Sequence, residues 1–295
     1  MMQKILFIVN PVSGGKDKST VLSAVGRHLD TGRFRYEVVQ TDRAGQAETL
    51  AHEADADIVV AVGGDGTVSE VARGLMDSDK ALGILPCGSG DGLALHLGIS
   101  RDPGRAVRSL CDGDIVRIDT GLFDTRPFFC TAGVGLDAAV SLDFARSGQR
   151  GLKTYIDTAW EDWKHFKPDT YTIETDGGSW SGEAVFVTVA NANQWGNRAR
   201  IAPDASLRDG LLDITVVKPF STLEIPELAR LLMTGHAKAS RRVESLRCKR
   251  ARIVRSAPGP AHLDGDPLQA GVAVEFAIRP GSLRVVVPAK RKDKI

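Results

Sequence analysis

The chain has 295 residues, of which 42% are hydrophobic and 25% charged, so it can form one large or two smaller folded domains. Its formal net charge of +1 excludes the global positive field that draws nucleic acid to a protein. The cysteines are scattered without a Cys-x-x-Cys pair, so we expect neither a disulfide framework nor a zinc site. The apolar run at 5–9 is too short for a signal peptide or a membrane span, and no run of about 18 apolar residues occurs, so we expect a soluble, cytoplasmic protein.

The first third of the chain alternates strand-like and helix-like segments. Four strands are predicted, at residues 4–10, 36–40, 58–62 and 82–85, and a helix-like pattern follows each of them. Such alternation is typical of a parallel sheet with helices on its faces, in which ligands bind beyond the carboxyl ends of the strands. Asn10, Thr41 and Asp65 stand at such ends, and we expect them to share one crevice.

A glycine-rich turn, Gly63-Gly64-Asp65-Gly66, separates the third strand from a helical pattern that begins at Val68. Glycines let backbone N–H groups and a helix N-terminus approach a ligand closely, which suits phosphate. A carboxylate there would repel phosphate unless a cation or a proton donor lies between them. The turn therefore favours phosphoryl transfer, with Asp65 acting on Mg²⁺ or on a hydroxyl group. The alternative is an ordinary strand-to-helix turn in which Asp65 caps the helix.

A second glycine-rich turn, residues 86–92, follows the fourth strand, and a loop at 11–16 follows the first. Two glycine turns at equivalent strand ends are a stronger signal than one. Neither matches the dinucleotide-binding fingerprint, because Ser69 and Leu93 stand where the third glycine belongs, so a Rossmann dehydrogenase is disfavoured. The 11–16 loop departs from the P-loop pattern, and a plain connecting loop is an equal alternative to a phosphate-binding one.

Near residue 115 the pattern changes to serial strands with turns rich in Gly, Asp and Pro. Strand-like runs occur at 115–123, 127–134, 170–175, 183–190, 211–217, 243–254, 272–278 and 283–287. Helical stretches near 150–166 and 221–233 interrupt them. We therefore predict a second, mostly antiparallel domain, with its boundary near 115–125.

Five segments, taken in order, resemble the diacylglycerol kinase catalytic-domain family, the lipid kinase superfamily that includes sphingosine kinases and soluble bacterial lipid kinases. They are Asn10-Pro11 with Ser13-Gly14-Gly15, Gly63-Gly64-Asp65-Gly66-Thr67 with Glu70, Leu85-Pro86-Cys87-Gly88-Ser89-Gly90-Asp91, Pro203-Asp204-Ala205 with Asp209-Gly210-Leu211-Leu212-Asp213, and His262-Leu263-Asp264-Gly265-Asp266. The second segment alone is shared with NAD kinases and, more loosely, phosphofructokinases, but the ordered set is specific. Two residues depart from the family pattern: Asp91 stands where Asn is usual, and Asp266 where Glu is usual. Asp91 adds a negative charge that could weaken nucleotide binding or recruit another cation.

The resemblance implies an α/β plus β-rich fold. Residues 1–120 would form an ATP-binding domain with a parallel sheet flanked by helices, similar to phosphofructokinases and NAD kinases. Residues 121–280 would form a mostly antiparallel β-sandwich domain for the lipid, and 281–295, a strand and a basic tail, could return to the first domain. The implied cofactors are ATP and Mg²⁺. The nucleotide would contact Asn10, Thr41, Gly63, Gly64, Asp65, Gly66, Thr67, Val68, Ser69, Gly88 and Ser89.

For the transfer itself, the resemblance implies that Asp65, Asp264 and Asp266 are the catalytic residues. Asp266 would be the general base and Asp264 its partner, since a lipid hydroxyl needs help to lose its proton. The alternative for residues 264–266 is a plain β-turn, which their composition fits well.

A structural Mg²⁺ site is implied at Asp209, whose carboxylate would bind the ion together with the backbone carbonyls of Ser206 and Leu211. An exposed turn aspartate is the alternative.

Residues 238–255 hold eight Lys and Arg side chains against a single acid, Glu244. With the basic tail they could dock on anionic lipid headgroups, each charge near the surface contributing about 1 kcal/mol. Peripheral contact with an anionic membrane is therefore expected alongside a cytoplasmic location, and a solvated face of two strands is the alternative.

We therefore expect a two-domain kinase that moves the γ-phosphoryl group of ATP to a hydroxyl of a membrane-derived lipid, such as diacylglycerol or a sphingoid base. The sequence does not indicate nucleic acid binding, and it does not define the oligomeric state. Two alternatives stay open. One is an NAD kinase-like enzyme with a soluble acceptor. The other is a catalytically silent protein that binds nucleotide or lipid. This alternative stays open because Asp91 and Asp266 differ from the family pattern.

Overall fold

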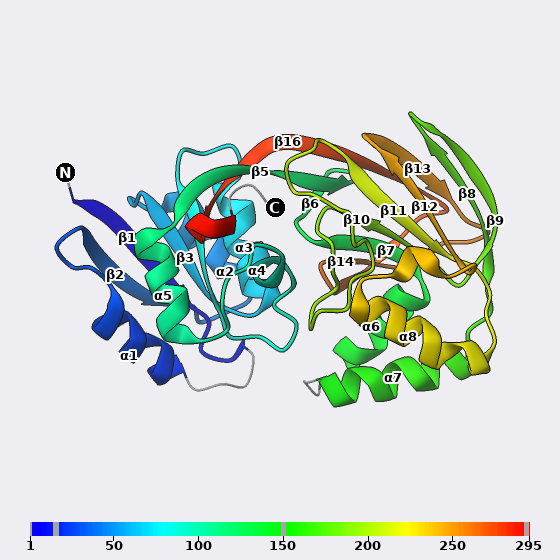
Figure 1. Cartoon of the computed structure of the whole chain (residues 1–295), viewed down its shortest axis with the longest axis horizontal. Coiled ribbons are helices and arrows are strands. Elements are labelled where there is room, and N and C mark those ends of the chain that lie inside the picture. Colours follow the sequence, from blue (N-terminus) through cyan, green and yellow to red (C-terminus); the bar gives the residue numbers. More distant parts are fainter. Residues whose placement is uncertain (1, 14–17, 149–151, 292–294) are drawn as a thin grey trace. The chain divides into compact units, whose positions relative to one another are not determined.

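The computed structural model describes residues 2–13, 18–148, 152–291 and 295. Gly14 and Gly15 of the first motif segment, and residues 292–294 of the basic tail, lie outside the described residues. The chain divides into two compact units: unit 1 is Met1–Asp119 with Gly281–Ile295, and unit 2 is Thr120–Pro280. Two strands, β5 (Asp114–Phe123) and β16 (Ala273–Val287), carry the chain from one unit to the other (Figure 1).

Unit 1 is built on a parallel sheet in the order β2-β1-β3-β4-β16. Its strands are β1 (Gln3–Val9), β2 (Phe34–Gln40), β3 (Ile58–Gly63), β4 (Ala81–Pro86) and the end of β16. Every residue of β3 and β4 is buried, as central strands are when helices cover both faces of a sheet. The near-continuous apolar sequence of these strands follows from that burial.

The helices of unit 1 pack in pairs. Helix α1 (Lys18–His28) packs with α5 (Pro103–Asp112), and α2 (Gln46–Glu53) packs with α3 (Asp65–Leu75). The crossover from β1 to β2 runs across the sheet in the opposite direction to those from β2 to β3 and from β3 to β4, so right-handed connections place α1 on one face and α2 with α3 on the other. The short helix α4 (Gly92–His96) follows β4.

Helix α5 is not among the segments predicted from the sequence, although its start carries a recognisable signal. Asp102 is the N-cap and accepts a hydrogen bond from the backbone N–H of Arg105 at 2.8 Å, and Pro103 is the first helical residue. Both are preferred at these positions of a helix.

Unit 2 consists of antiparallel sheets. One has the order β12-β11-β10-β7-β14-β15. The other places β16-β13-β8-β9 side by side, with β5 next to β16 and β6 next to β5. The strands are β6 (Arg126–Phe128), β7 (Thr131–Gly135), β8 (Asp169–Thr175), β9 (Gly178–Ala184), β10 (Phe186–Ala190), β11 (Leu212–Val217), β12 (Val243–Cys248), β13 (Arg250–Val254), β14 (Gly259–Leu263) and β15 (Asp266–Ala270). Side chains of both sheets, among them Val134, Ile173 and Phe276, share one buried core. The predicted architecture, a parallel α/β part followed by a mostly antiparallel β part, is confirmed.

Helices cover one face of the six-stranded sheet in unit 2. They are α6 (Leu136–Arg146), α7 (Leu152–His165) and α8 (Ile225–Thr234), with short 3₁₀ segments η2 (Thr222–Glu224) and η3 (Ala237–Ala239); a further one, η4 (Ala289–Arg291), lies in unit 1. Alternate residues of β10 serve the two faces: Val187 and Val189 join the core between the sheets, whereas Phe186 and Ala190 pack with the helices. Among the described residues, no helix has both the length and the apolar character needed to cross a bilayer.

Several predicted strand boundaries are wrong. The runs 127–134, 183–190 and 243–254 each contain a break, and 272–278 and 283–287 belong to the single strand β16. The β14–β15 hairpin and α6 are also missing from the prediction. Helix α6 has no simple polar face, because Asp137 and Ser141 are buried together with its apolar residues, so its sequence lacks the usual helical pattern.

Candidate functional site

The carboxyl ends of the unit 1 strands lie at one level. Val9 is paired with Gln40 on one side and with Val62 on the other, and Val62 is paired with Leu85. The residues that follow these positions include Asn10 and Thr41, so the register places the predicted nucleotide contacts of separate loops along one edge. Backbone hydrogen bonds hold these loops: Asn10 N–H donates to the Val62 carbonyl at 3.1 Å, and Thr41 N–H to the Val9 carbonyl at 2.9 Å.

The two glycine turns contact each other through their backbones. The N–H of Cys87 donates to the carbonyl of Gly63 at 2.8 Å. A Cβ added at Gly64 would lie 3.2 Å from the Cα of Gly88, and one added at Gly88 only 2.8 Å from the Cα of Gly64. This contact excludes a side chain at Gly88 unless the turns move apart, so the second turn needs its glycine for close approach.

The side chain of Asp65 connects the first turn to the second. Its carboxylate accepts the backbone N–H of Asp91 at 2.8 Å and that of Gly92 at 2.7 Å, so it satisfies the start of α4 and not of its own helix α3. Burial raises the pKa of Asp65, although these hydrogen bonds and the nearby Arg101 act in the opposite direction. Each carboxylate oxygen accepts one N–H, which leaves acceptor capacity on both oxygens for a further donor or a cation.

The first turn of α3 contributes the other predicted contacts. Gly64 is the N-cap, and Thr67, Val68 and Ser69 are buried. The buried hydroxyl of Thr67 has no hydrogen-bond partner among the residues that the structure describes. At Gly66, within the same described part of the chain, an added Cβ would meet nothing within 4 Å. The first N–H groups of a helix have no intrahelical acceptor, so this open, glycine-lined start of α3 suits an anion.

Glu70, the last residue of the same motif, has a structural role that the sequence does not show. Its carboxylate accepts the backbone N–H of Gly45 at 2.9 Å and that of Ala47 at 3.2 Å, at the start of α2. It thereby fixes the segment that follows Thr41. In the second turn, Asp91 is buried and its Oδ1 accepts the N–H of Gly88 at 2.8 Å.

In unit 2, Asp264 and Gly265 form the two-residue turn of the β14–β15 hairpin, with Leu263 paired to Asp266. Their φ angles of 51° and 90° are those of a type I′ turn, for which Asp-Gly is a favoured sequence. The Asp264 carboxylate accepts the backbone N–H groups of residues 129–131, the closest at 2.7 Å from Cys130. Asp266, by contrast, is exposed. The β-turn named as the alternative is therefore present, and it separates a carboxylate that binds backbone from one that is accessible.

A buried polar network lies beside this hairpin. The Oδ2 atom of Asp137 lies 3.2 Å from Nε2 of His262 and accepts the hydroxyl of Thr188 at 2.8 Å. The N–H of Gly265 donates to Nδ1 of His262 at 3.4 Å, which leaves the ring proton on Nε2. A Cβ at Gly133 would lie 2.3 Å from Oδ2 of Asp137, so this network requires glycine there. Asp137 and Thr188 are distant from His262 in the sequence, and neither belongs to one of the motif segments, so sequence reasoning missed them.

The predicted Mg²⁺ site around Asp209 has a different arrangement. The Asp209 carboxylate forms an ion pair with Arg247 and accepts the N–H of Leu211 at 3.1 Å, while the hydroxyl of Ser206 accepts the N–H of Arg208 at 3.3 Å. A magnesium ion would have to displace Arg247 from this carboxylate. In the described parts of the chain, no cluster of three or more His, Cys, Asp or Glu side chains could hold a metal. The Mg²⁺ site at Asp209 therefore stays a prediction, and it requires that Arg247 leaves this carboxylate.

Most cations of the basic segment 238–255 have partners elsewhere in the chain. Nζ of Lys238 lies 2.8 Å from Asp204, Nε of Arg242 lies 2.8 Å from Glu224, and Nη1 of Arg252 lies 3.6 Å from Glu174. Arg255 is buried and donates to four backbone carbonyls. The charge that this segment offers to an anionic surface is therefore smaller than the sequence suggests.

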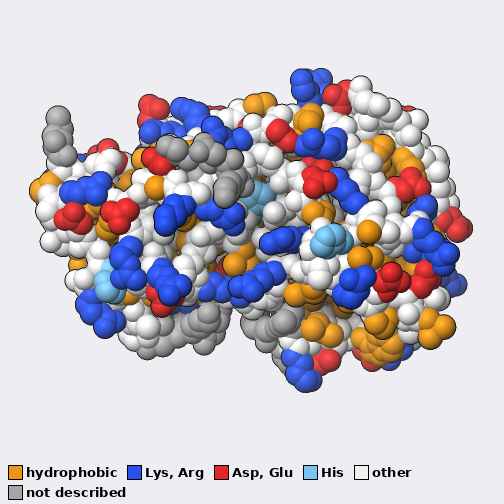
Figure 2. All heavy atoms as spheres, viewed as in Figure 1, with side chains coloured by type: hydrophobic (Ala, Val, Ile, Leu, Met, Phe, Trp, Pro, Cys, Tyr) orange, Lys and Arg blue, Asp and Glu red, His pale blue; other side chains and the backbone are white. Residues whose placement is uncertain are grey.

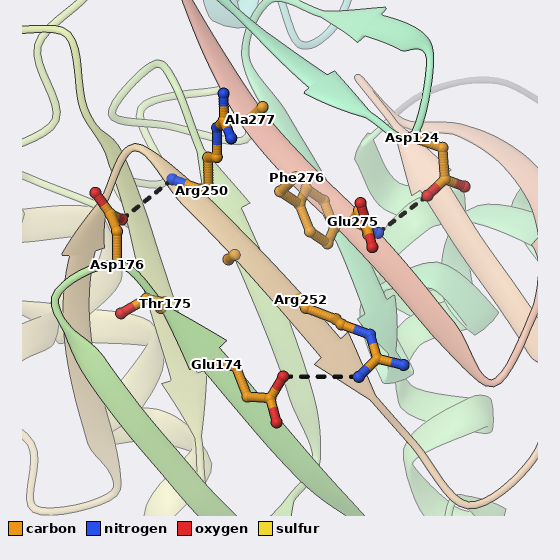
Figure 3. A pocket seen from close by; sticks show the side chains of 10 residues that line it. Asp124, Glu174, Thr175, Asp176, Arg250, Arg252, Glu275, Phe276 and Ala277 are labelled. Carbon is orange, nitrogen blue, oxygen red and sulfur yellow. Dashed lines mark hydrogen bonds and ion pairs between the residues drawn. The ribbon is translucent and has the colours of Figure 1, made fainter.

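A groove of about 420 Å³ opens on β8, β13 and β16 in unit 2 and contains none of the predicted site residues (Figure 3). Three of its acids have partners: Glu174 pairs with Arg252, Asp176 accepts the N–H of Arg250 at 3.2 Å, and Asp124 accepts that of Glu275 at 3.0 Å. We therefore locate the candidate site by the motif residues and their contacts, and not by this groove.

The fold is that of known kinases. The structure resembles a diacylglycerol kinase from Bacillus anthracis, with a TM-score of 0.74 at 21% identity over 97% of both chains. It also resembles an NAD kinase from Archaeoglobus fulgidus in complex with ATP, with a TM-score of 0.52 at 12% identity over 99% of this chain and 96% of that one. At these identities the likeness is one of fold.

The sequence comparisons define the family. Residues 4–123 match the diacylglycerol kinase catalytic domain, and residues 130–287 match the YegS C-terminal NAD kinase beta sandwich-like domain. A diacylglycerol kinase of Bacillus subtilis is 27% identical over 100% of this chain and 99% of its own length. A probable lipid kinase, YegS-like, of Pseudomonas aeruginosa is 30% identical over 97% of this chain and 95% of its own. The chain belongs to the diacylglycerol kinase catalytic-domain family, as its five motif segments predicted, and is a member of a family of phosphotransferases.

Proposed function

We propose that this chain transfers the γ-phosphoryl group of ATP to a hydroxyl group of a membrane-derived lipid. The observation that supports this most directly is the coupling of the two glycine turns of unit 1 through the carboxylate of Asp65. Relatives with nearly full coverage are named diacylglycerol kinase and lipid kinase, and ATP is the ligand named for the NAD kinase of similar fold.

Unit 1 would hold the nucleotide. Catalysis of phosphoryl transfer rests mainly on positioning and charge neutralisation, and the open start of α3 offers N–H groups to the phosphates. Asn10, Thr41 and Ser89 would add polar contacts. Bound Mg²⁺ would neutralise phosphate charge, and Asp65 is the carboxylate at this edge with free acceptor capacity to hold it.

Unit 2 would supply the general base. Asp266 is exposed at the start of β15, so its carboxylate can take the proton of an acceptor hydroxyl. Asp264 would act as its partner by fixing the hairpin against residues 129–131. Asp266 would thus act as the base and Asp264 as the anchor of the hairpin, and the two carboxylates need not share a proton.

A lipid acceptor also requires access to a membrane surface, and we propose peripheral contact with an anionic bilayer. Helix α7, segment η2 and helix α8 expose Ile156, Trp160, Leu223 and Met233, and Figure 2 shows apolar side chains gathered over the α7 and α8 region. Amphipathic surfaces with aromatic and aliphatic side chains bind at the headgroup boundary. Loss of vesicle binding in a Trp160→Glu variant, with turnover on a micellar lipid retained, would support this contact, and unchanged binding would count against it.

The deciding experiment is transfer of labelled γ-phosphate from ATP to a panel of lipids in mixed micelles with Mg²⁺, with Asp65→Ala as control. We expect at least one labelled lipid, lost in the control. Labelling of NAD in the same assay, with no labelled lipid, would instead indicate a kinase of a soluble acceptor. ATP binding without transfer to any acceptor would indicate a silent binding protein.

A further inference from the structure

Asp91 places a carboxylate inside the second glycine turn, where the family pattern has a neutral Asn. The residue lies at φ 51°, its side chain is 1% exposed, and its Oδ1 atom accepts the N–H of Gly88. An Asn side chain could accept the same N–H through its amide oxygen. The second carboxylate oxygen, Oδ2, is what distinguishes the two residues, because it is buried with a negative charge.

Arg101 supplies the matching positive charge. Its Nε atom lies 2.9 Å from Oδ2 of Asp91. Its Nη2 atom donates to the carbonyl of Ser89 at 2.9 Å and to that of Gly90 at 2.6 Å. One planar guanidinium thus binds three consecutive residues of the turn, which is the rigid, multidentate contact that arginine makes and lysine does not.

This clamp acts on the groups that contact Asp65. Residues 91 and 92 donate their N–H groups to the Asp65 carboxylate, and they directly follow the carbonyls that Arg101 holds. The position of the turn relative to Asp65 therefore depends on Arg101. The pair has no net charge, as an Asn would have none, so an Asp at position 91 is compatible with an anionic ligand only while Arg101 is present.

We propose that Arg101 is a positioning residue for the nucleotide site, and that Asp91 and Arg101 form a matched pair that replaces the Asn of the family pattern. This inference rests on the proposed binding of ATP in unit 1. It identifies the cation that balances Asp91 as a side chain of the chain itself. It also means that an Asp in place of the usual Asn at position 91 is compatible with a catalytically active protein.

The test is a double-substitution cycle on nucleotide affinity. Arg101→Gln leaves a buried carboxylate unbalanced near the phosphates, so we expect the Kd of a non-hydrolysable ATP analogue with Mg²⁺ to rise about tenfold or more. Asp91→Asn leaves an unbalanced cation there, so its Kd should equal the wild-type value or fall below it. The double variant Asp91→Asn/Arg101→Gln should return to within about threefold of wild type, because both charges are gone.

The directions in which the two single substitutions change the Kd distinguish this role from a purely structural one. A structural contact predicts that both single substitutions weaken binding, whereas charge matching predicts that Arg101→Gln weakens it and Asp91→Asn does not. In turnover assays with a fixed lipid, KM for ATP should change while KM for the lipid does not. Arg108→Gln removes an exposed arginine from α5 and serves as a control of equal charge change.

Isothermal titration measures the nucleotide affinity without any lipid, so its outcome is independent of the acceptor. A wild-type Kd in Arg101→Gln, or a double variant as weak as Arg101→Gln alone, would overturn the inference and leave the lipid kinase proposal intact. A wild-type protein that binds no ATP analogue would overturn both. If Arg101→Gln does not fold, the double variant decides: wild-type affinity supports the pair, and a tenfold loss refutes it.

Discussion

Asp65 in unit 1 and Asp264 in unit 2 are motif aspartates with the same structural role, which is to anchor another loop. Each carboxylate accepts backbone N–H groups of another loop: Asp65 those of residues 91 and 92, and Asp264 those of residues 129–131. In unit 1 the anchoring carboxylate is also the one at the strand edge where a nucleotide would bind. In unit 2 anchoring falls to Asp264, and its neighbour Asp266 is the exposed acid.

The difference teaches that a motif carboxylate can combine positioning and chemistry or divide them between two residues. Where the roles are divided, substitutions should separate activity from stability. Where they are combined, both should change together.

The largest effect is expected for Asp266→Asn. Loss of a general base lowers turnover by about 10²–10⁴-fold, and because Asp266 is exposed, the melting temperature should stay within experimental error of wild type. Lipid kinase kinetics and thermal unfolding of the same preparation measure both. Asp266→Glu restores the residue usual in the family and is the matched control, which should retain activity. Wild-type turnover in Asp266→Asn would remove this residue from the mechanism.

Asp264→Ala should instead damage stability. It removes the acceptor of three backbone N–H groups, and an unsatisfied buried donor costs about 1–3 kcal/mol. The free energy of unfolding from urea titration should fall by at least that amount, and turnover should fall because the hairpin that carries Asp266 loses its anchor. A variant that is inactive but as stable as wild type would show that Asp264 acts chemically and that the roles are not divided.

The contrast between the two units also explains what the sequence could predict. In unit 1 the contacts of Asp65 are with residues 26 and 27 positions away, at the end of the neighbouring strand. Strand and turn patterns predict that these two turns lie close together, although they do not predict the hydrogen bonds themselves. In unit 2 the partners of Asp264 are 133 to 135 positions away. No local pattern shows that contact, and the sequence pattern predicts a continuous strand across the break between β6 and β7 where these partners lie.

The same reasoning accounts for the other differences. Arg101 lies outside every motif segment, and only the folded chain shows that it binds Asp91. The ion pair between Asp209 and Arg247 is likewise invisible to a motif that specifies only one of its members. Helix α5 is different, since Asp102 and Pro103 are a local start signal, and attention to capping residues could have found it.

A smaller effect is expected for Glu70→Gln. Glu70 resembles Asp264 in that it only anchors a backbone segment, because its carboxylate caps the start of α2 through Gly45 and Ala47. Loss of such a cap costs about 1 kcal/mol, and the amide keeps one acceptor oxygen. Urea unfolding should show a loss no greater than this, with at most a modest rise in KM for ATP. A loss of turnover as large as that of Asp266→Asn would assign Glu70 a chemical role instead.

The smallest effect is a pH dependence that marks Asp65 as the carboxylate with combined roles. Because burial raises its pKa in the folded state, the folded protein holds this proton more tightly than the unfolded chain. The stability from this proton is fully present below the unfolded pKa and is lost as pH rises through the folded one. Asp65→Asn has no such proton to lose. As pH rises above about 4, the melting temperature of the nucleotide-free variant should therefore rise relative to wild type, while its kinase activity is lost at every pH. A difference in melting temperature that stays constant over this range would mean that Asp65 is ionised at little cost in the folded protein, and the contrast with Asp264 would then rest on activity alone.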